Sequence, residues 1–341
     1  WYLVDFIWEN GQWRVAEIAD SPEHELFVTD CNGERHLLAR LELSKAKETL
    51  GIWFAPSGSA VDQVKEMRKL TENWADQFRT GKLSQPEAWL ALTTTIWKTL
   101  EYPLNALTLT KEECEYVMAP AISSGLNGAG ICRNLPKALR HGPTSYQGLE
   151  LPHIYAIQGI ARLTDLLNHN HIDTNTGFLH RASLEQMIVN AGLGPDLLEY
   201  SHKKYGQLAT FSLMEQNWKF LSDNKIVLLH DIKMPTRREG DDFLMKIFVN
   251  HALTKPTLLA AQRCMQYLQV STVSDITNGD GSRVSDNALA GNYDSQRPHY
   301  YQWPYQQKPP TADWTIWRRI LRQCLHDEKL SLNHRIGHWT D

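Results

Sequence analysis

The sequence predicts an α+β fold, with a small antiparallel β-meander at the N-terminus followed by a mainly α-helical body. Three observations predict it. Asn-Gly pairs separate strand-like runs in residues 1–55, and Asn-Gly favours type I′ hairpin turns, which need positive φ at both central positions. From residue 60 onward, apolar residues recur at helical spacing. Two capping boxes then mark the starts of consecutive helices.

The expected meander begins with WYLVDFIW and WRVAEIA, which flank Asn10 and Gly11. It continues with ELFVTD and RHLLARL, which flank Asn32 and Gly33. The run LGIWF, from Leu50, is expected to be a further strand, closed by a turn over residues 56–59. These runs are rich in the aromatic and branched residues that strands favour.

Three consecutive helices should follow the meander. The first is expected over 61–78, and the second opens with Ser84 and Glu87 as a capping box and stops before Pro103. The third repeats the device with Thr110 and Glu113. Short connections between consecutive helices predict a compact bundle. Further helices are expected near 153–170, 178–191, 206–222, 241–253, 255–269 and 312–326, with a loop-like stretch over 271–310.

These patterns divide the chain into four expected segments. Residues 1–58 form the β module, 59–145 the helical bundle, 146–270 a C-terminal helical domain, and 271–341 a loop-rich linker with a terminal helix. The sequence opens on Trp1, directly in a strand-like run. We therefore expect it to be a piece of a longer polypeptide whose N-terminal part is missing.

Composition narrows the class of protein. The 341 residues carry a net charge of −4, which gives no general attraction to nucleic acid. Five cysteines form no Cys-x-x-Cys pair, which argues against a zinc ribbon and suits a reducing compartment. No apolar run approaches the roughly 18 residues of a membrane span, so no membrane partner is expected. With no targeting segment visible, we expect an intracellular protein, nuclear or cytoplasmic.

Three stretches resemble catalytic or metal motifs, and each favours a structural interpretation. Asp241 and Asp242 in REGDDF precede a helical pattern, so they are interpreted as first-turn acids at a helix N-terminus. In NHNHID, over 168–173, two His at i and i+2 do not face each other on a helix. DITNGDGSR, over 275–283, lacks the ligand spacing of a calcium loop and is expected to be a turn. No catalytic or metal-binding residue is assigned, and no cofactor is expected for this chain.

Basic residues are the remaining candidates for a binding site, and two interpretations stay open. Lys65, Lys69 and Arg79 would form either a phosphate-facing edge of the first helix or its solvated face. Arg133, Lys137 and Arg140, followed by His141, lie in a stretch with few acids, which makes them better phosphate candidates.

LGIWFAPSGS, followed by a basic amphipathic helix, resembles the end of the palm in reverse transcriptases of non-LTR retrotransposons. There, a Leu-Gly strand, the counterpart of the primer grip, leads into a helical thumb. Residues 130–155, GICRNLPKALRHGPTSYQGLELPHIY, resemble the stretch beyond the thumb, although two glycines of its Gly-Gly-Leu-Gly-like turn are absent here. WYLVDFIW, WLALTTTIWKTLEYPLNALTLT and the closing HYYQWPYQQKPP and DWTIWRRIL are also similar to reverse-transcriptase-like proteins.

The resemblance implies a role for each segment. Leu50, Gly51 and Ile52 would be primer-grip-like, and the bundle would be thumb-like. The basic residues would hold an RNA–DNA or DNA duplex, and the palm and fingers, upstream in the same polypeptide, would hold the catalytic Mg²⁺ ions. This chain would then bind primer and template without being catalytic.

Two alternatives stay open. A domesticated or decayed copy would serve as a helical protein-interaction scaffold, which the negative charge and the 12 Trp residues favour. A free-standing enzyme is the other, and the lack of any recognisable ligand constellation argues against it.

Overall fold

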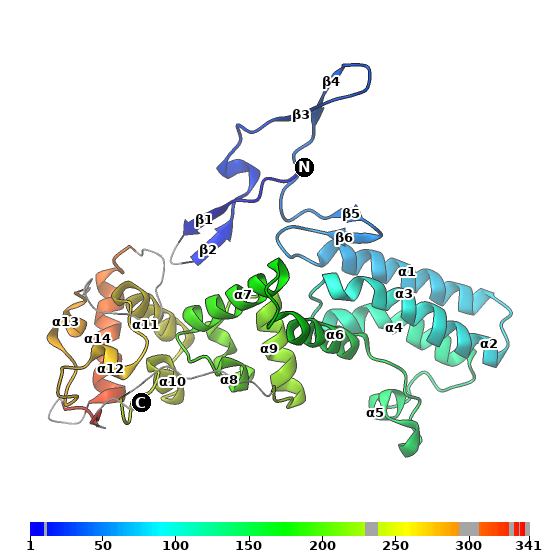
Figure 1. Ribbon diagram of the computed structural model, residues 1–341. Coiled ribbons are helices and arrows are strands. Elements are labelled where there is room, and N and C mark those ends of the chain that lie inside the picture. The colour runs from blue at the N-terminus through cyan, green and yellow to red at the C-terminus, as the bar shows by residue number, and fades with distance from the viewer. Residues whose placement is uncertain (10–11, 229–237, 293–306, 327–330, 334, 338–341) are drawn as a thin grey trace. The chain divides into compact units, whose positions relative to one another are not determined.

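The computed structural model divides the chain into two compact units, Trp1–Asn168 and His169–Asp341. It describes residues 1–9, 12–228, 238–292, 307–326, 331–333 and 335–337 (Figure 1). Small antiparallel sheets lie near the N-terminus and helices make up most of the rest, so the predicted α+β class is confirmed. The expected boundaries at 58 and 145 fall inside the first unit, and the one at 270 inside the second.

The described strands pair two by two, in three separate antiparallel hairpins. The pairs are β1 (Phe6–Glu9) with β2 (Gln12–Val15), β3 (Leu26–Thr29) with β4 (Arg35–Leu38), and β5 (Lys47–Thr49) with β6 (Ile52–Phe54). A meander would also join neighbouring hairpins. Here the links are long and irregular, and one of them contains the short 3₁₀ helix η1 (Ile18–Asp20), so strand pairing does not extend across them.

The predicted hairpin at Asn32 and Gly33 exists, but its turn is not type I′. Gly33 has a φ of 84°, whereas Asn32 is not among the residues with positive φ. The connection is longer than two residues, and the Gly33 N–H donates to the Asp30 carbonyl. Asp30 also accepts from the Asn32 and Glu34 N–H groups, which gives the turn a different geometry. Asn10 and Gly11 lie outside the described residues.

The three predicted helices of the bundle are all present. They are α1 (Val61–Thr80), a second helix built from α2 (Gln85–Leu90), the π-helix η2 (Ala91–Ile96) and α3 (Trp97–Glu101), and α4 (Lys111–Gly128). Both predicted capping boxes form, at Ser84 with Glu87 and at Thr110 with Glu113. The second helix ends at Glu101, before Pro103 as expected, and the chain continues as the 3₁₀ segment η3 (Tyr102–Ala106), in whose first turn proline fits.

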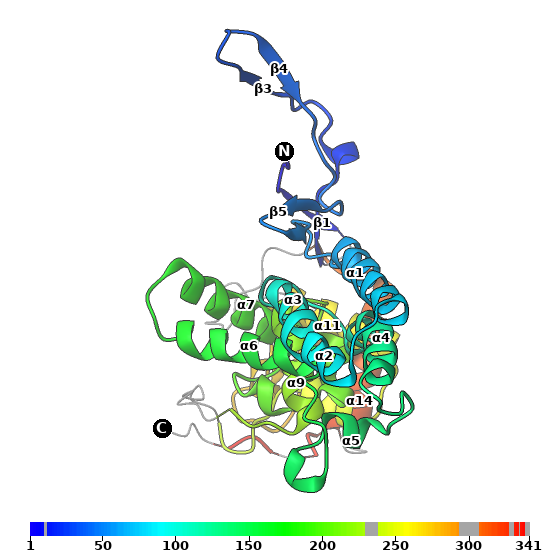
Figure 2. The ribbon, with the colours of Figure 1, turned by 90° about the vertical axis from the view of Figure 1, so that its right-hand side faces the viewer.

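Within the first unit, α1 packs along α4, and α2 also contacts α4 (Figures 1 and 2). The rest of this unit comprises α5 (Lys137–His141), η4 (Thr144–Tyr146) and α6 (Ile154–His169). Hydrogen bonds join α6, and the residues just before it, to the bundle. The Gln158 side chain bonds both the N–H and the carbonyl of Leu109, and the fully buried Trp97 donates its indole N–H to the Pro152 carbonyl.

Helices are the regular elements of the second unit within its described residues, joined by turns and by a few isolated β-bridges. Its elements are α7 (Asn175–Ala191), η5 (Leu197–Glu199), α8 (His202–Tyr205), η6 (Gly206–Leu208), α9 (Leu213–Asn224), α10 (Leu244–Asn250), α11 (Lys255–Leu268), α12 (Val273–Ile276), α13 (Asp286–Ala290) and α14 (Thr311–Leu325). The core includes Trp218, Phe248 and Trp317. The helix expected at 206–222 begins only at Leu213, because Ser212 caps it there and a 3₁₀ turn precedes it.

Two helices are fixed to each other in this unit. Helix α11 packs on α14, and the Arg263 guanidinium bonds both carboxylate oxygens of Asp313, at 2.7 and 3.0 Å. The Asp313 carboxylate is buried, whereas the Arg263 side chain is 39% exposed, so the pair joins the two helices at the edge of the core. The stretch expected to be loop-like, 271–310, includes α12 and α13, while 293–306 lies outside the described residues.

The acidic motifs have structural partners. Asp241 and Asp242 precede α10 rather than lying in its first turn. Asp241 accepts from the Ser274 N–H and Asp242 pairs with Lys246, so the two carboxylates serve separate contacts. Residues 278–283 form the expected turn, closed by a hydrogen bond from the Asn278 N–H to the Arg283 carbonyl. Among the described residues, no helix combines the length and apolar character needed to cross a membrane.

Candidate nucleic-acid interface

The primer-grip-like residues lie at the tip of the β5–β6 hairpin. Thr49 pairs with Ile52, which leaves Leu50 and Gly51 as a two-residue turn. Their φ angles are 52° and 80°, so both central positions are left-handed, as a type I′ turn requires. Glycine adopts this geometry freely, whereas leucine rarely does.

Two side-chain hydrogen bonds attach this hairpin to the bundle. The Tyr102 hydroxyl, at the end of the second helix, donates to the Leu50 carbonyl at 2.9 Å. The Trp53 N–H in β6 donates to Gln63 Oε1 in α1 at 2.6 Å. Since β6 also packs on α1, the turn is held at a defined place on the helices.

Leu50 is both strained and exposed. A left-handed conformation costs a leucine about 1 kcal/mol. The side chain is 86% exposed, so packing inside this chain offsets little of that cost. An Asn-Gly turn would avoid the strain. Leu50 therefore presents an apolar side chain to the surroundings at a conformational cost.

The cations of α1 differ in their partners. Lys65 lies 3.4 Å from Asp62, and Arg79 forms an ion pair with Asp76. Lys69 is exposed and has no acidic partner among the described residues. Lys65 and Lys69 lie on adjacent turns, while Arg79 is about 15 Å farther along the helix. The helix therefore carries one unpaired predicted cation.

The cations around α5 also differ. Lys137 pairs with Glu115 of α4 at 2.7 Å, and this contact lowers the pKa of Glu115. Arg140 donates to the carbonyls of Arg133 and Leu135, at 3.4 and 3.1 Å, and so holds its own loop. The Arg133 side chain is exposed and has no acidic partner among the described residues.

Two histidines beside this group are not positively charged at neutral pH. Burial lowers the pKa of His153 to about 4, with a smaller contribution from His141. Burial also lowers the pKa of His141, whose ring nitrogen bonds the Leu151 carbonyl at 2.6 Å. Their rings lie 5.0 Å apart. His141 therefore adds no charge to the predicted phosphate site.

Taken together, three of the six predicted cations, Lys69, Arg133 and Arg140, have no acidic partner within the described residues, and Arg140 directs its hydrogen bonds to carbonyls of its own loop. Leu50, Gly51 and Ile52 do form one unit, a turn fixed to the bundle. This arrangement would support a shallow contact with a duplex, through one apolar tip and a few charges, and would not support a deep basic groove.

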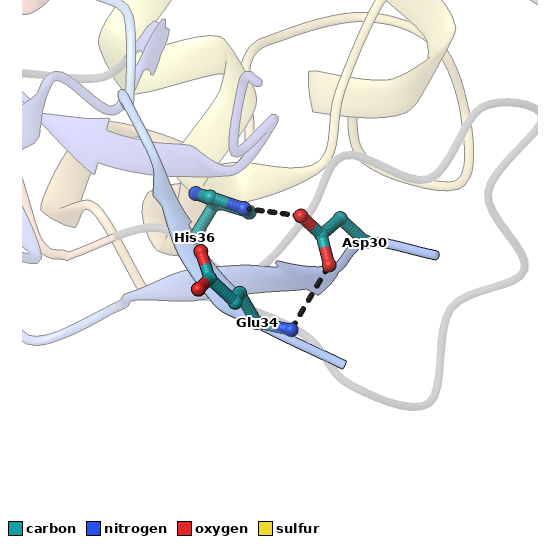
Figure 3. Close-up of side chains that lie close together, drawn as sticks. All are labelled: Asp30, Glu34 and His36. Carbon is teal, nitrogen blue, oxygen red and sulfur yellow. Dashed lines mark hydrogen bonds and ion pairs between the residues drawn. The ribbon is translucent and has the colours of Figure 1, made fainter. Parts of the chain in front are cut away.

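Sequence reasoning missed one further grouping. Asp30, Glu34 and His36 converge on the β3–β4 hairpin (Figure 3). The sequence contained a signal for this grouping, because two acidic residues and a histidine surround the Asn32–Gly33 turn. Pairing of the two strands brings these residues together. Comparisons with known proteins found no matching family model, no matching curated protein and no matching solved structure.

Proposed function

We propose that this chain is the primer–template-holding, C-terminal portion of a retroelement-type reverse transcriptase. In this proposal the Leu50–Gly51 turn and the bundle contact an RNA–DNA or DNA duplex. Upstream palm and fingers of the same polypeptide would carry out the chemistry with Mg²⁺. The observation that carries the proposal is the exposed, left-handed Leu50, on a turn bonded to the bundle through Tyr102.

The backbone strain at Leu50 is the first reason to expect a bound partner there. Residues held in unfavourable backbone conformations cluster at sites that contact ligands, because the surrounding structure must maintain them. The Leu50 side chain contributes little packing to its own chain, so contact with a bound partner would offset the conformational cost. A leucine tip suits the sugar face of a primer strand, which is less polar than its phosphates.

Electrostatic attraction in this proposal is weak. Lys69 and Arg133 are the predicted cations that remain available to phosphates. Each phosphate contact contributes about 0.9 to the slope of log K against log salt, so two contacts predict a slope of about −2. A thumb-like bundle would accept A-form geometry, so an RNA–DNA hybrid should bind at least as well as B-form DNA.

The test is a binding titration by fluorescence anisotropy, with an RNA–DNA hybrid over a salt series. The Lys69→Ala, Arg133→Ala double variant should weaken binding and bring the slope close to zero. Lys98→Ala is the matched control, because Lys98 is exposed and already pairs with Glu101 at 2.7 Å. An unchanged affinity and slope in the double variant would contradict the proposal.

A second candidate, a protein-interaction scaffold, is favoured by a different observation. The β3–β4 hairpin exposes apolar side chains on both faces: Leu26, Phe27, Val28, Leu37 and Leu38. Pairing of Lys65, Arg79 and Lys137 with acids also suits a surface that does not bind phosphates. Absence of hybrid binding even at low salt would favour this candidate over the first.

A further inference from the structure

The β3–β4 hairpin gathers three side chains of a kind that binds metal ions. One donor atom each from Asp30, Glu34 and His36 lies within 4.8 Å of the others. The His36 Nε2 atom is 3.1 Å from Asp30 Oδ2 (Figure 3). In the same view the Glu34 carboxylate lies beside the His36 ring.

Strand pairing explains why these side chains meet. Thr29 pairs with Arg35 and Val28 with His36, and the Asp30 N–H donates to the Glu34 carbonyl. Side chains two residues apart on a strand share a face, so Glu34 and His36 lie on the same side, with Asp30 opposite Glu34. The position of each donor is therefore fixed by the hairpin register.

The turn also orients the Asp30 carboxylate. Its Oδ1 atom accepts the N–H groups of Asn32 and Glu34, at 2.8 and 2.9 Å. Its Oδ2 atom points toward His36 and the remaining donors. The hydrogen bond from His36, together with these backbone bonds, lowers the pKa of Asp30, so its carboxylate is ionised at neutral pH.

The donor set selects the kind of ion. Calcium and magnesium take oxygen ligands almost exclusively, whereas imidazole combined with carboxylates suits zinc and similar first-row ions. In a tetrahedral zinc site, neighbouring ligand atoms lie about 3.3 Å apart. Small rotations of the exposed Glu34 and His36 side chains would bring the three donor atoms from their present spacing to this distance. The nearby Cys31 thiol is not among the converging atoms.

We propose that Asp30, Glu34 and His36 form a site for a divalent transition-metal ion of the zinc type, with water completing its coordination. Such an ion would tie the end of β3 to the start of β4. It would also neutralise two adjacent carboxylates, those of Asp30 and Glu34. The proposal does not depend on nucleic-acid binding.

The test is calorimetric titration of Zn²⁺ into the full chain after chelator treatment, with Co²⁺ absorption spectra as a second readout. Glu34→Gln and His36→Ala should each weaken Zn²⁺ binding at this site at least about tenfold. Glu34→Gln preserves the fold, because the Glu34 side chain makes no hydrogen bond in the hairpin and only its backbone is engaged. Controls are His24→Ala and Cys31→Ser, which alter exposed donors outside the cluster.

Hydrogen exchange provides a check on location. Zn²⁺ should slow exchange of the β3–β4 amides in the parent chain and not in Glu34→Gln. Two results would overturn the proposal. One is equal Zn²⁺ binding by the parent, Glu34→Gln and His36→Ala chains. The other is loss of the site in Cys31→Ser or His24→Ala with retention in the two cluster variants.

Discussion

Replacing Leu50 by Asn should stabilise the hairpin while weakening duplex binding. Asn is at ease in the left-handed region, so the substitution removes about 1 kcal/mol of strain. Because Leu50 is 86% exposed, the packing lost is only about 0.3 kcal/mol. The Tyr102 bond goes to the backbone carbonyl and survives the change. The net gain is about 0.7 kcal/mol.

Amide hydrogen exchange of Trp53 measures this gain. Its N–H bonds to Gln63, so its exchange reports opening of the hairpin from α1, and Leu50→Asn should slow it about threefold. Leu50→Ala is the matched control, since alanine keeps the left-handed penalty while losing the apolar side chain. Both variants should bind an RNA–DNA hybrid less tightly. Faster Trp53 exchange in Leu50→Asn would refute the strain argument, and unchanged hybrid binding would refute the role of the tip.

Two further predictions concern stability. Asp313→Asn should destabilise the second unit by about 2–3 kcal/mol in urea unfolding, because it breaks a doubly hydrogen-bonded pair with Arg263 in which the aspartate is buried. The comparison is the pair of Arg68 with Glu72, whose carboxylate is 55% exposed, so Glu72→Gln should cost less than about 1 kcal/mol. Similar costs for the two variants would contradict this difference. For His153, burial lowers the pKa from 6.5 to about 4, so the unfolded chain binds the proton more readily and folding stability should fall as pH drops from 6.5 to 4. The full pKa shift of His153 corresponds to about 3 kcal/mol of folding free energy. Solvent screening at this half-buried ring reduces the expected effect to about 1–2 kcal/mol. His153→Gln should flatten urea stability over this pH range, and an unchanged pH dependence would show that other groups cause it.

The helices were predictable where their signals are local. Ser84 with Glu87, and Thr110 with Glu113, form capping boxes within four residues, and each begins a helix as expected. Hairpin turns were harder to predict. Propensity favoured type I′ geometry at Asn32–Gly33, yet left-handed angles at both positions occur at Leu50–Gly51. The Leu50–Gly51 turn is attached to the bundle through Tyr102. This contact joins residues far apart in the sequence, so local propensities do not predict it.

The candidate site was predictable in its residue types and not in its charge. Lys137 comes from a stretch with few acids, but its partner Glu115 is on another helix. Arg140 bonds carbonyls of its own loop, which depends on a backbone path that the sequence does not specify. The Asp30, Glu34 and His36 group was missed because its members converge only through strand register.

The π-helix η2 has a consequence for the length of the chain. Buried residues of the second helix include a series at every fourth position: Ala88, Leu92, Ile96 and Leu100. At 3.6 residues a turn, such a series drifts about 40° per step, or about 120° in all, and would leave the buried face. A wider turn at Ala91–Ile96 reduces the drift by accommodating an extra residue. A chain that is one residue shorter within Thr93–Thr95 could therefore form a regular α-helix at this turn. It would still bury the apolar residues on both sides of η2.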